Sequence, residues 1–162
     1  MLSDASRAES WAMFDAKFGE LRPGLHSEDW PAIVEPSPSI TFDLRRGDGK
    51  SIGARIDAVN AAALRCFVEG FDDDPQWVVL DWQHDGYSLD AAVHANTSDT
   101  EWRVPVFPDG DYYTFARLDF SEGTFGHPWE QTLCVFGPRL VEILGRTLSI
   151  WLPVKRINGQ PA

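Results

Sequence analysis

Apolar residues recur with helical spacing in two stretches of the chain. In residues 6–20 three aromatic positions lie three or four residues apart, namely Trp11, Phe14 and Phe18. Ser6 stands where a helix N-cap is expected. From Ser51 to about Glu69 apolar side chains again form one stripe, and Ser51 can cap this second helix. A short third helix is expected from Pro138 through Leu144.

Strands are predicted where apolar and polar residues alternate. The expected strands are 39–45, 76–83, 112–118, 131–136 and 150–154, with a weaker one in 87–93. The stretch 76–83 is apolar on both faces, which is typical of an interior strand. Residues 23–38 hold four prolines and no periodicity, so they are expected to form an extended connection. Gly47-Asp48-Gly49 predicts a turn.

These elements predict an α+β fold. A mainly antiparallel sheet of about five strands is expected, with two longer helices and one short helix packed on it. The 162 residues suit one domain, predicted to span 1–154, with a flexible C-terminal tail at 155–162.

Charge and composition exclude several classes of function. The net charge is −11, with 25 acidic and 14 basic residues, so we expect neither nucleic acid nor a membrane as partner. No apolar run is long enough for a membrane span or a signal peptide, which predicts a cytoplasmic protein. Two distant cysteines form no disulfide framework. No cofactor and no metal site are predicted, and the oligomeric state stays open.

The first candidate site follows the strand at 76–83. Asp81, Gln83 and His84, with Tyr87 shortly after, would form a polar cluster at a strand end. His84 is then a candidate base or ligand oriented by a carboxylate. The alternative is a histidine at the sheet end that only bonds a neighbour.

The second candidate site is the segment from Gly123 to Glu130. Pro128 favours an extended conformation at His127, and the glycines permit unusual backbone angles. His127 and Glu130, beside Trp129, could form an acid/base pair or supply two ligands of a metal. The alternative is a specialised turn in which both side chains satisfy backbone groups.

Other chemical motifs are weaker. Asp109 and Asp111 are candidate binding residues, although Asp109 also suits a turn before Gly110. Asp111 and Asp119 bracket a strand and are too far apart to act as one dyad. Gly49-Lys50-Ser51 lacks the earlier glycine of a phosphate-binding loop, because position 44 is Leu44.

Four segments of the chain together resemble a known bacterial family. They are Glu35-Pro36-Ser37-Pro38-Ser39, Asp81-Trp82-Gln83-His84, Pro108-Asp109-Gly110-Asp111-Tyr112-Tyr113 and the loop from Gly126 to Glu130. This combination is similar to the family catalogued as domain of unknown function 2716, from about Trp11 to Trp151. The resemblance implies a bacterial origin and no catalytic assignment. Asp85 departs from the Pro or Ser expected after the histidine of the second segment.

Two function classes follow. The first is a non-catalytic binding domain for a protein, including a basic toxin-like partner, or for a small ligand, because acidic surfaces complement basic ones. An exposed aromatic such as Trp102 would then anchor the partner. The alternative is a small hydrolase or metal-dependent enzyme that uses His127 and Glu130, with His84 or Asp81 in the same pocket.

Overall fold

A single antiparallel sheet is the centre of the computed structural model, which describes residues 1–45, 51–97 and 101–162. Its eight strands follow the order β3-β2-β4-β5-β6-β1-β7-β8. They are β1 (Ser39–Asp43), β2 (Gln76–Asp81), β3 (Tyr87–Asp90), β4 (Tyr113–Ala116), β5 (Gly123–His127), β6 (Thr132–Phe136), β7 (Val154–Ile157) and β8 (Gln160–Pro161). The predicted α+β class and antiparallel sheet are confirmed, but the sheet is larger than the five strands expected.

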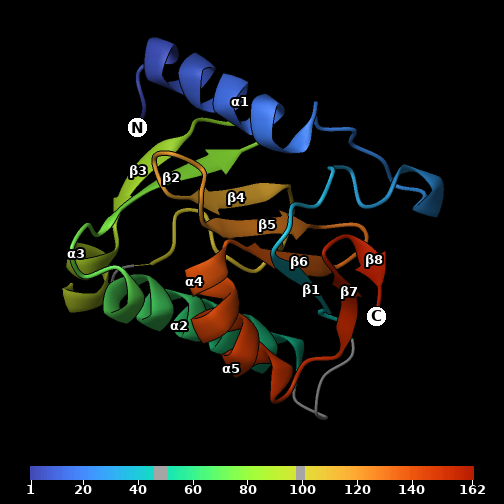
Figure 1. Ribbon diagram of the computed structural model, residues 1–162. Helices are drawn as coiled ribbons and strands as arrows, with labels where there is room; N and C mark the ends of the chain where they lie inside the picture. The colour runs from blue at the N-terminus through green and yellow to red at the C-terminus, as the bar shows by residue number, and fades with distance from the viewer. Residues whose placement is uncertain (46–50, 98–100) are drawn as a thin grey trace.

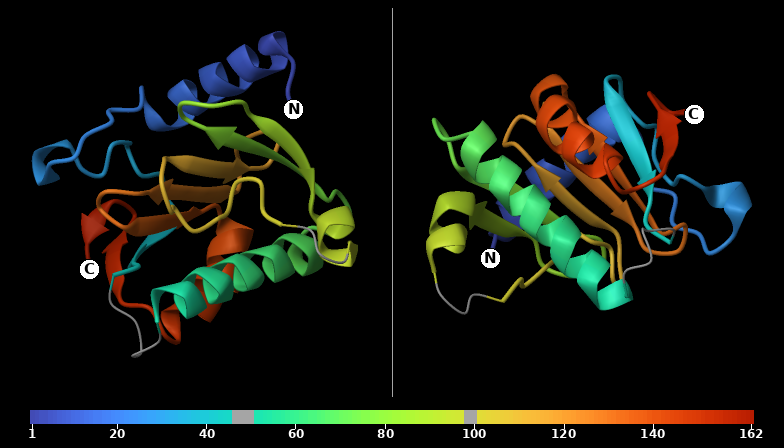
Figure 2. Two further views of the ribbon diagram at one scale, coloured as in Figure 1. Left: turned by 180° about the vertical axis from the view of Figure 1, so that it is seen from behind. Right: turned by 90° about the horizontal axis from the view of Figure 1, so that it is seen from below.

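Helices cover both faces of the sheet (Figure 1). Helix α1 (Asp4–Phe18) lies over one face. Helix α2 (Ile52–Gly70) lies over the other, beside a helical segment made of α4 (Pro138–Leu140), the π-helical turn η2 (Val141–Gly145) and α5 (Arg146–Ser149) (Figure 2). None of the helices within the described ranges is long and apolar enough to cross a membrane.

Each face of the sheet carries its own hydrophobic core, which explains the unbroken apolar runs in the strands. In β2, Trp77 and Val79 belong to the core under α2, whereas Val78 and Leu80 belong to the core under α1. Successive side chains of a strand point to opposite faces, so a strand between two helical layers is apolar at every position. The interior position predicted for 76–83 is confirmed, because β2 lies between β3 and β4.

The predicted N-cap is confirmed for α2 but is wrong for α1. Ser51 caps α2 by accepting a hydrogen bond from the backbone N–H of Ala54 at 3.2 Å. The cap of α1 is Ser3, not Ser6, and the Ser3 hydroxyl accepts from the Ser6 N–H at 3.2 Å. Because Ser3 and Ser6 both suit a cap, the apolar stripe alone did not separate them. The turn predicted at Gly47–Gly49 lies outside the described residues.

Two segments differ from the predicted elements. Residues 123–127, expected to be a loop because of their glycines, form β5 in the middle of the sheet. A Cβ on Gly123 would collide with the carbonyl oxygen of Phe115, so close packing of strands is what requires this glycine. The weak strand expected over 87–93 ends at Asp90, whose side chain then caps the short helix α3 (Ala91–Asn96).

The C-terminal prediction is corrected by the structure. The strand expected at 150–154 begins only at Val154, and residues 155–162, expected to be a flexible tail, hold most of β7 and all of β8. Strand β7 pairs with β1, with Thr41 opposite Arg156. The sequence Val154-Lys155-Arg156-Ile157 resembles a polar tail, but buried acidic partners from distant segments satisfy its charges.

Candidate functional site

One end of the sheet gathers the residues singled out from the sequence. Strand β2 ends at Asp81, which lies opposite Tyr113 at the start of β4. Tyr113 in turn lies opposite Gly126 near the end of β5. His127 lies opposite Thr132 at the start of β6. Antiparallel pairing therefore brings both candidate segments, which lie some distance apart in sequence, to the same end of the sheet.

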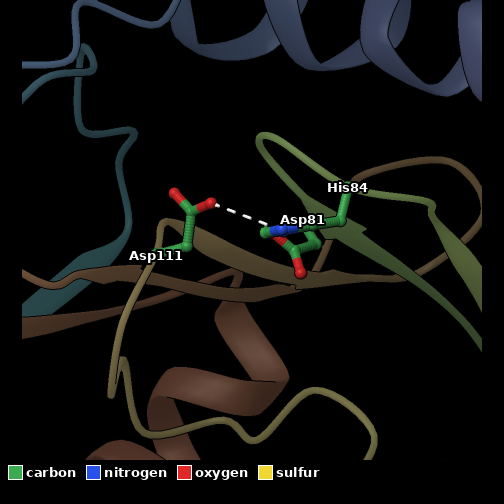
Figure 3. A group of neighbouring side chains, drawn as sticks. All are labelled: Asp81, His84 and Asp111. Carbon is green, nitrogen blue, oxygen red and sulfur yellow. Dashed lines mark hydrogen bonds and ion pairs between the residues drawn. The ribbon is translucent and has the colours of Figure 1, made fainter.

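Asp81, His84 and Asp111 form one polar cluster at this end (Figure 3). His84 Nδ1 lies 2.9 Å from Asp81 Oδ1 and 3.7 Å from Asp111 Oδ2. The Asp81 and Asp111 side chains are only 10% and 13% exposed, whereas the imidazole is 65% exposed. The predicted meeting of Asp81 with His84 is thus present, and Asp111 joins them from the loop before β4.

The charges in this cluster act on one another. Burial raises the pKa of Asp111, and the nearby Asp81 raises it further. The hydrogen bond to Asp81, and the negative charge of Asp81, raise the pKa of His84. Burial and the charge of Asp109 raise the pKa of the Tyr113 phenol. Asp109 therefore belongs to the same acidic region of the surface.

His127 is enclosed at the neighbouring strand end. Its residue exposure is 1%, and its Nδ1 accepts a hydrogen bond from the backbone N–H of Glu130 at 3.0 Å. The ring lies edge-on to Trp30 and Tyr112, with centroid distances of 5.9 and 4.8 Å. Among the residues that the structure describes, Nε2 has no hydrogen-bond partner. Burial lowers the pKa of His127 to about 4, so the ring is neutral at pH 7.

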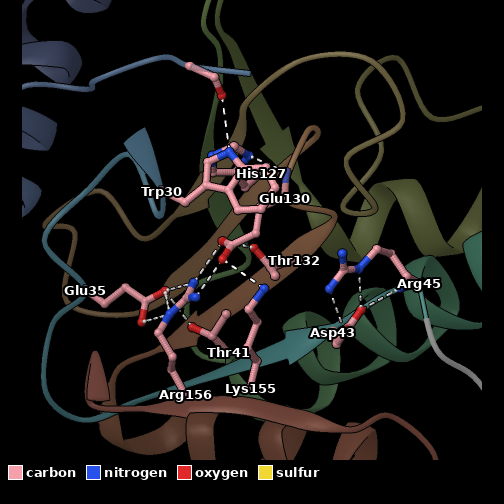
Figure 4. A network of polar contacts seen from close by, with 11 residues as sticks. Trp30, Glu35, Thr41, Asp43, Arg45, His127, Glu130, Thr132, Lys155 and Arg156 are labelled. Atoms are coloured by element: carbon pink, nitrogen blue, oxygen red, sulfur yellow. Dashed lines mark hydrogen bonds and ion pairs between the residues drawn. The ribbon is translucent and has the colours of Figure 1, made fainter. Parts of the chain in front are cut away.

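Glu130 is held in a buried ionic network (Figure 4). Its carboxylate accepts hydrogen bonds from Arg156 at 2.7 and 2.9 Å and from the Thr132 hydroxyl at 2.9 Å. Lys155 Nζ lies 3.1 Å from Glu130 Oε1. Arg156 also pairs with Glu35, at 2.8 Å. Burial raises the pKa of Glu130, but the hydrogen bonds and charge of Arg156, with the hydrogen bonds from Thr132 and Lys155, together outweigh it and lower the pKa to about 2.

The surroundings of His127 and Glu130 are those of residues that stabilise the fold. The carboxylate oxygens of Glu130 are occupied by cations and a hydroxyl, and neither residue is more than 1% exposed. Within the described ranges, no hydrogen bond, ion pair or ring contact joins His84 to His127. The two histidines, which the alternative enzyme hypothesis placed in one pocket, thus belong to separate clusters at one end of the sheet.

Trp129 lies at an open groove between these clusters and the N-terminus of α2. The groove has a volume of about 440 Å³. Among its lining residues are Leu25, Ile52, Phe107, Pro108, Asp109 and Trp129. Trp129 is 49% exposed, Leu25 61% and Ile52 52%. The walls of the groove include the segment that begins at Pro108 and the loop that begins at Gly126. These are two of the four segments that carry the family resemblance.

The remaining predicted residues lie elsewhere. Gln83 is exposed in the turn after β2. Tyr87 packs against the core on the α2 side, where the Arg103 guanidinium lies 4.7 Å from its ring centroid. Trp102, considered as an exposed anchor, is partly buried against the same core. None of these three side chains joins the Asp81 cluster or the groove.

Sequence reasoning missed the cationic half of the ionic network. Arg156 and Lys155 were assigned to a tail, and Glu35 was noticed only within a proline-rich motif. The Lys155-Arg156 pair could have pointed to a buried role, because a cation in a strongly acidic chain has many carboxylates available as partners.

Comparison with known proteins shows that the family resemblance extends over most of the chain. The family model described as "Protein of unknown function (DUF2716)" matches residues 1–141. The chain belongs to this family. A relative, the "Uncharacterized protein YxiI" of Bacillus subtilis (strain 168), is 36% identical over 150 residues, which cover 88% of this chain and 90% of the relative. No solved structure matches. The resemblance predicted from the four segments is confirmed.

Proposed function

We propose that this DUF2716 protein is a non-catalytic binding domain, and that it engages a basic protein partner through the groove at Trp129. The observation that carries the proposal is a half-exposed tryptophan in an open apolar groove on the rim of an acidic region. A small ligand in the same groove is the other version of this function.

The apolar residues of the groove suit a protein partner. Exposed Leu25, Ile52 and Trp129 converge on one concave surface, whereas scattered single apolar residues would need no explanation. Tryptophan in such a position is among the residues whose truncation most often costs about 2 kcal/mol or more of binding free energy. Trp129 is therefore the expected anchor.

The charge of the surroundings favours a basic partner over an acidic one. Asp109 lines the groove, and its charge acts on Tyr113 together with the charges of Asp81 and Asp111. The whole chain carries a net charge of −11. Complementary charge of this kind accelerates association and selects against like-charged partners.

An enzyme that uses His127 and Glu130 has less support from the geometry. A general base must reach the proton that it abstracts, and a substrate has no access to two residues that are 1% exposed. Binding in the groove at Trp129, by contrast, leaves the contacts of His127 and Glu130 intact.

The proposal is tested by comparing variants in a quantitative capture experiment. The full chain is immobilised and incubated with a lysate of its source organism, and captured proteins are quantified by mass spectrometry. Trp129→Ser and Asp109→Asn alter the groove. Leu118→Ser and Asp73→Asn are matched controls, because both residues are exposed and lie near the opposite end of the sheet.

The expected result is a basic protein that wild type and both controls retain. With that partner purified, titration calorimetry should show affinity lowered about 30-fold by Trp129→Ser, equivalent to ~2 kcal/mol. Asp109→Asn should weaken binding mainly at low salt. A captured set that is unchanged by Trp129→Ser, or a Trp129-dependent partner that is acidic, would contradict the proposal.

A further inference from the structure

The cluster of Asp81, His84 and Asp111 has the composition of a metal-ligand set. Each residue offers one donor atom, and the three donors lie within 4.8 Å of one another. They come from three places in the chain: the end of β2, the turn that follows it, and the loop before β4. Asp81 and His84 meet within one turn, and a tertiary contact adds Asp111 from a segment about 27 residues further along the chain.

The cluster is short of positive charge. Asp81 and Asp111 approach the same nitrogen of His84, at 2.9 and 3.7 Å, and both carboxylate side chains are largely shielded from water. Two adjacent, desolvated carboxylates repel one another unless a proton or a cation lies between them. Within the described residues, the only ion pairs of these two carboxylates are with His84.

The distances fit a small divalent ion. Zinc lies 2.0–2.1 Å from imidazole nitrogen and about 2.0–2.2 Å from carboxylate oxygen, so neighbouring donors of a tetrahedral site are about 3.3 Å apart. The distances from His84 Nδ1 to the two carboxylates, 2.9 and 3.7 Å, lie on either side of that value. A change of less than about half an ångström would bring each of these two distances to that value, and the two carboxylates lie within 4.8 Å of each other.

The donor types distinguish between metals. Magnesium and calcium prefer all-oxygen sites, whereas an imidazole beside carboxylates suits zinc and other first-row transition ions. Three protein donors also leave a fourth tetrahedral position for water or another ligand. The 65% exposure of His84 places that open position at the surface.

We propose that Asp81, His84 and Asp111 bind one divalent transition-metal ion, best represented by Zn²⁺, with a coordination position open to solvent. The sequence alone predicted no metal site. The ion can bind with or without a partner in the Trp129 groove, and it would offset the negative charges of Asp81 and Asp111 near that groove.

The direct test is calorimetric titration of the chelator-treated full chain with ZnCl₂, and separately with MgCl₂. One Zn²⁺ per chain is expected, and no binding of Mg²⁺ at the same concentrations. His84→Ala and Asp111→Asn should each weaken Zn²⁺ binding by more than about tenfold, the loss typical even for residues that only orient a ligand. Exposed His84 can be replaced without disturbing the core, so circular dichroism should show an unchanged fold.

Matched controls keep the test specific. Asp85→Asn removes a neighbouring charge, and His26→Ala removes another exposed histidine; neither should change the affinity by more than about twofold. NMR spectra of the ring nitrogens should show His84 Nδ1 shifting on addition of Zn²⁺. Zn²⁺ binding that survives His84→Ala, a shift at His26 or His94 in place of His84, or no binding of Zn²⁺ would each overturn the inference.

Discussion

Replacing Arg156 by methionine should destabilise the protein severely. Arg156 bridges Glu35 and Glu130, whose side chains are both 2% exposed. In the variant, Glu130 would keep Lys155 and Thr132, but Glu35 would keep only the hydroxyl of Thr41, at 2.8 Å. Methionine fills similar space, so the loss of charge compensation dominates the effect.

The magnitude follows from the buried charges. Removing one member of a buried ion pair typically costs about 3–5 kcal/mol, because a desolvated charge is left unpaired. The pKa of Glu130 gives a consistent figure: lowering it from 4.5 to about 2 corresponds to ~3 kcal/mol at neutral pH. Since domains of this kind unfold with about 5–15 kcal/mol, the variant would lose a large part of its stability.

Urea denaturation followed by tryptophan fluorescence is the assay. With a urea dependence of about 2 kcal/mol per molar, the midpoint of Arg156→Met should fall by roughly 1.5–2.5 M. Arg156→Lys keeps a charge but cannot bridge both carboxylates with paired hydrogen bonds. Its urea midpoint should therefore lie between those of wild type and Arg156→Met. Arg146→Met is the control, because Arg146 is exposed, and it should lie within about 0.5 kcal/mol of wild type.

The pH dependence provides a second check on the same reasoning. Because the folded pKa of Glu130 is depressed, its ionic contribution is complete above pH 4.5 and is lost as pH falls through about 2. The difference between wild type and Arg156→Met should therefore shrink over that window. A stability loss below about 1 kcal/mol at pH 7 would refute the view that Arg156 compensates two buried carboxylates.

Two further predictions concern β5. The folded pKa of His127, about 4, lies below its ordinary 6.5, so this residue costs stability as pH falls from 6.5 to about 4. His127→Asn retains an acceptor for the Glu130 N–H but does not titrate, so its urea midpoints should vary less with pH over that window; equal slopes for both proteins would contradict this. Gly123→Ala should lower the urea midpoint by at least the equivalent of about 2 kcal/mol, because the added Cβ meets the Phe115 carbonyl oxygen. The reference is Gly53→Ala, where a Cβ meets nothing within 4 Å; similar midpoints for the two variants would show that β4 and β5 separate easily.

Much of the fold was predictable because its signals are local. The stripe of Trp11, Phe14 and Phe18 specifies α1, and Ser51 both caps and begins α2. The doubly apolar run at 76–83 identified an interior strand. These patterns depend on a residue's immediate neighbours and on the period of the element, which is the information that a single sequence carries.

The candidate site was predictable only in its parts. Asp81, His84, Asp109, Asp111 and Trp129 were all singled out from the sequence. Their division between a carboxylate–histidine cluster and an apolar groove depends on strand register, because the pairing of Asp81 with Tyr113 and of Tyr113 with Gly126 decides which loops meet. Local patterns contain no register between strands that are distant in the chain.

The sequence by itself determined the α+β class, the acidic character of the protein, its two long helices and the types of side chain available for a site. Only the tertiary structure decided that the glycine-rich segment is β5, that the charged C-terminal residues form β7, and that His127 and Glu130 are buried. The physical reason is long-range compensation: Arg156 is 121 residues from Glu35, and a buried charge is stable only where its distant partner is brought to it.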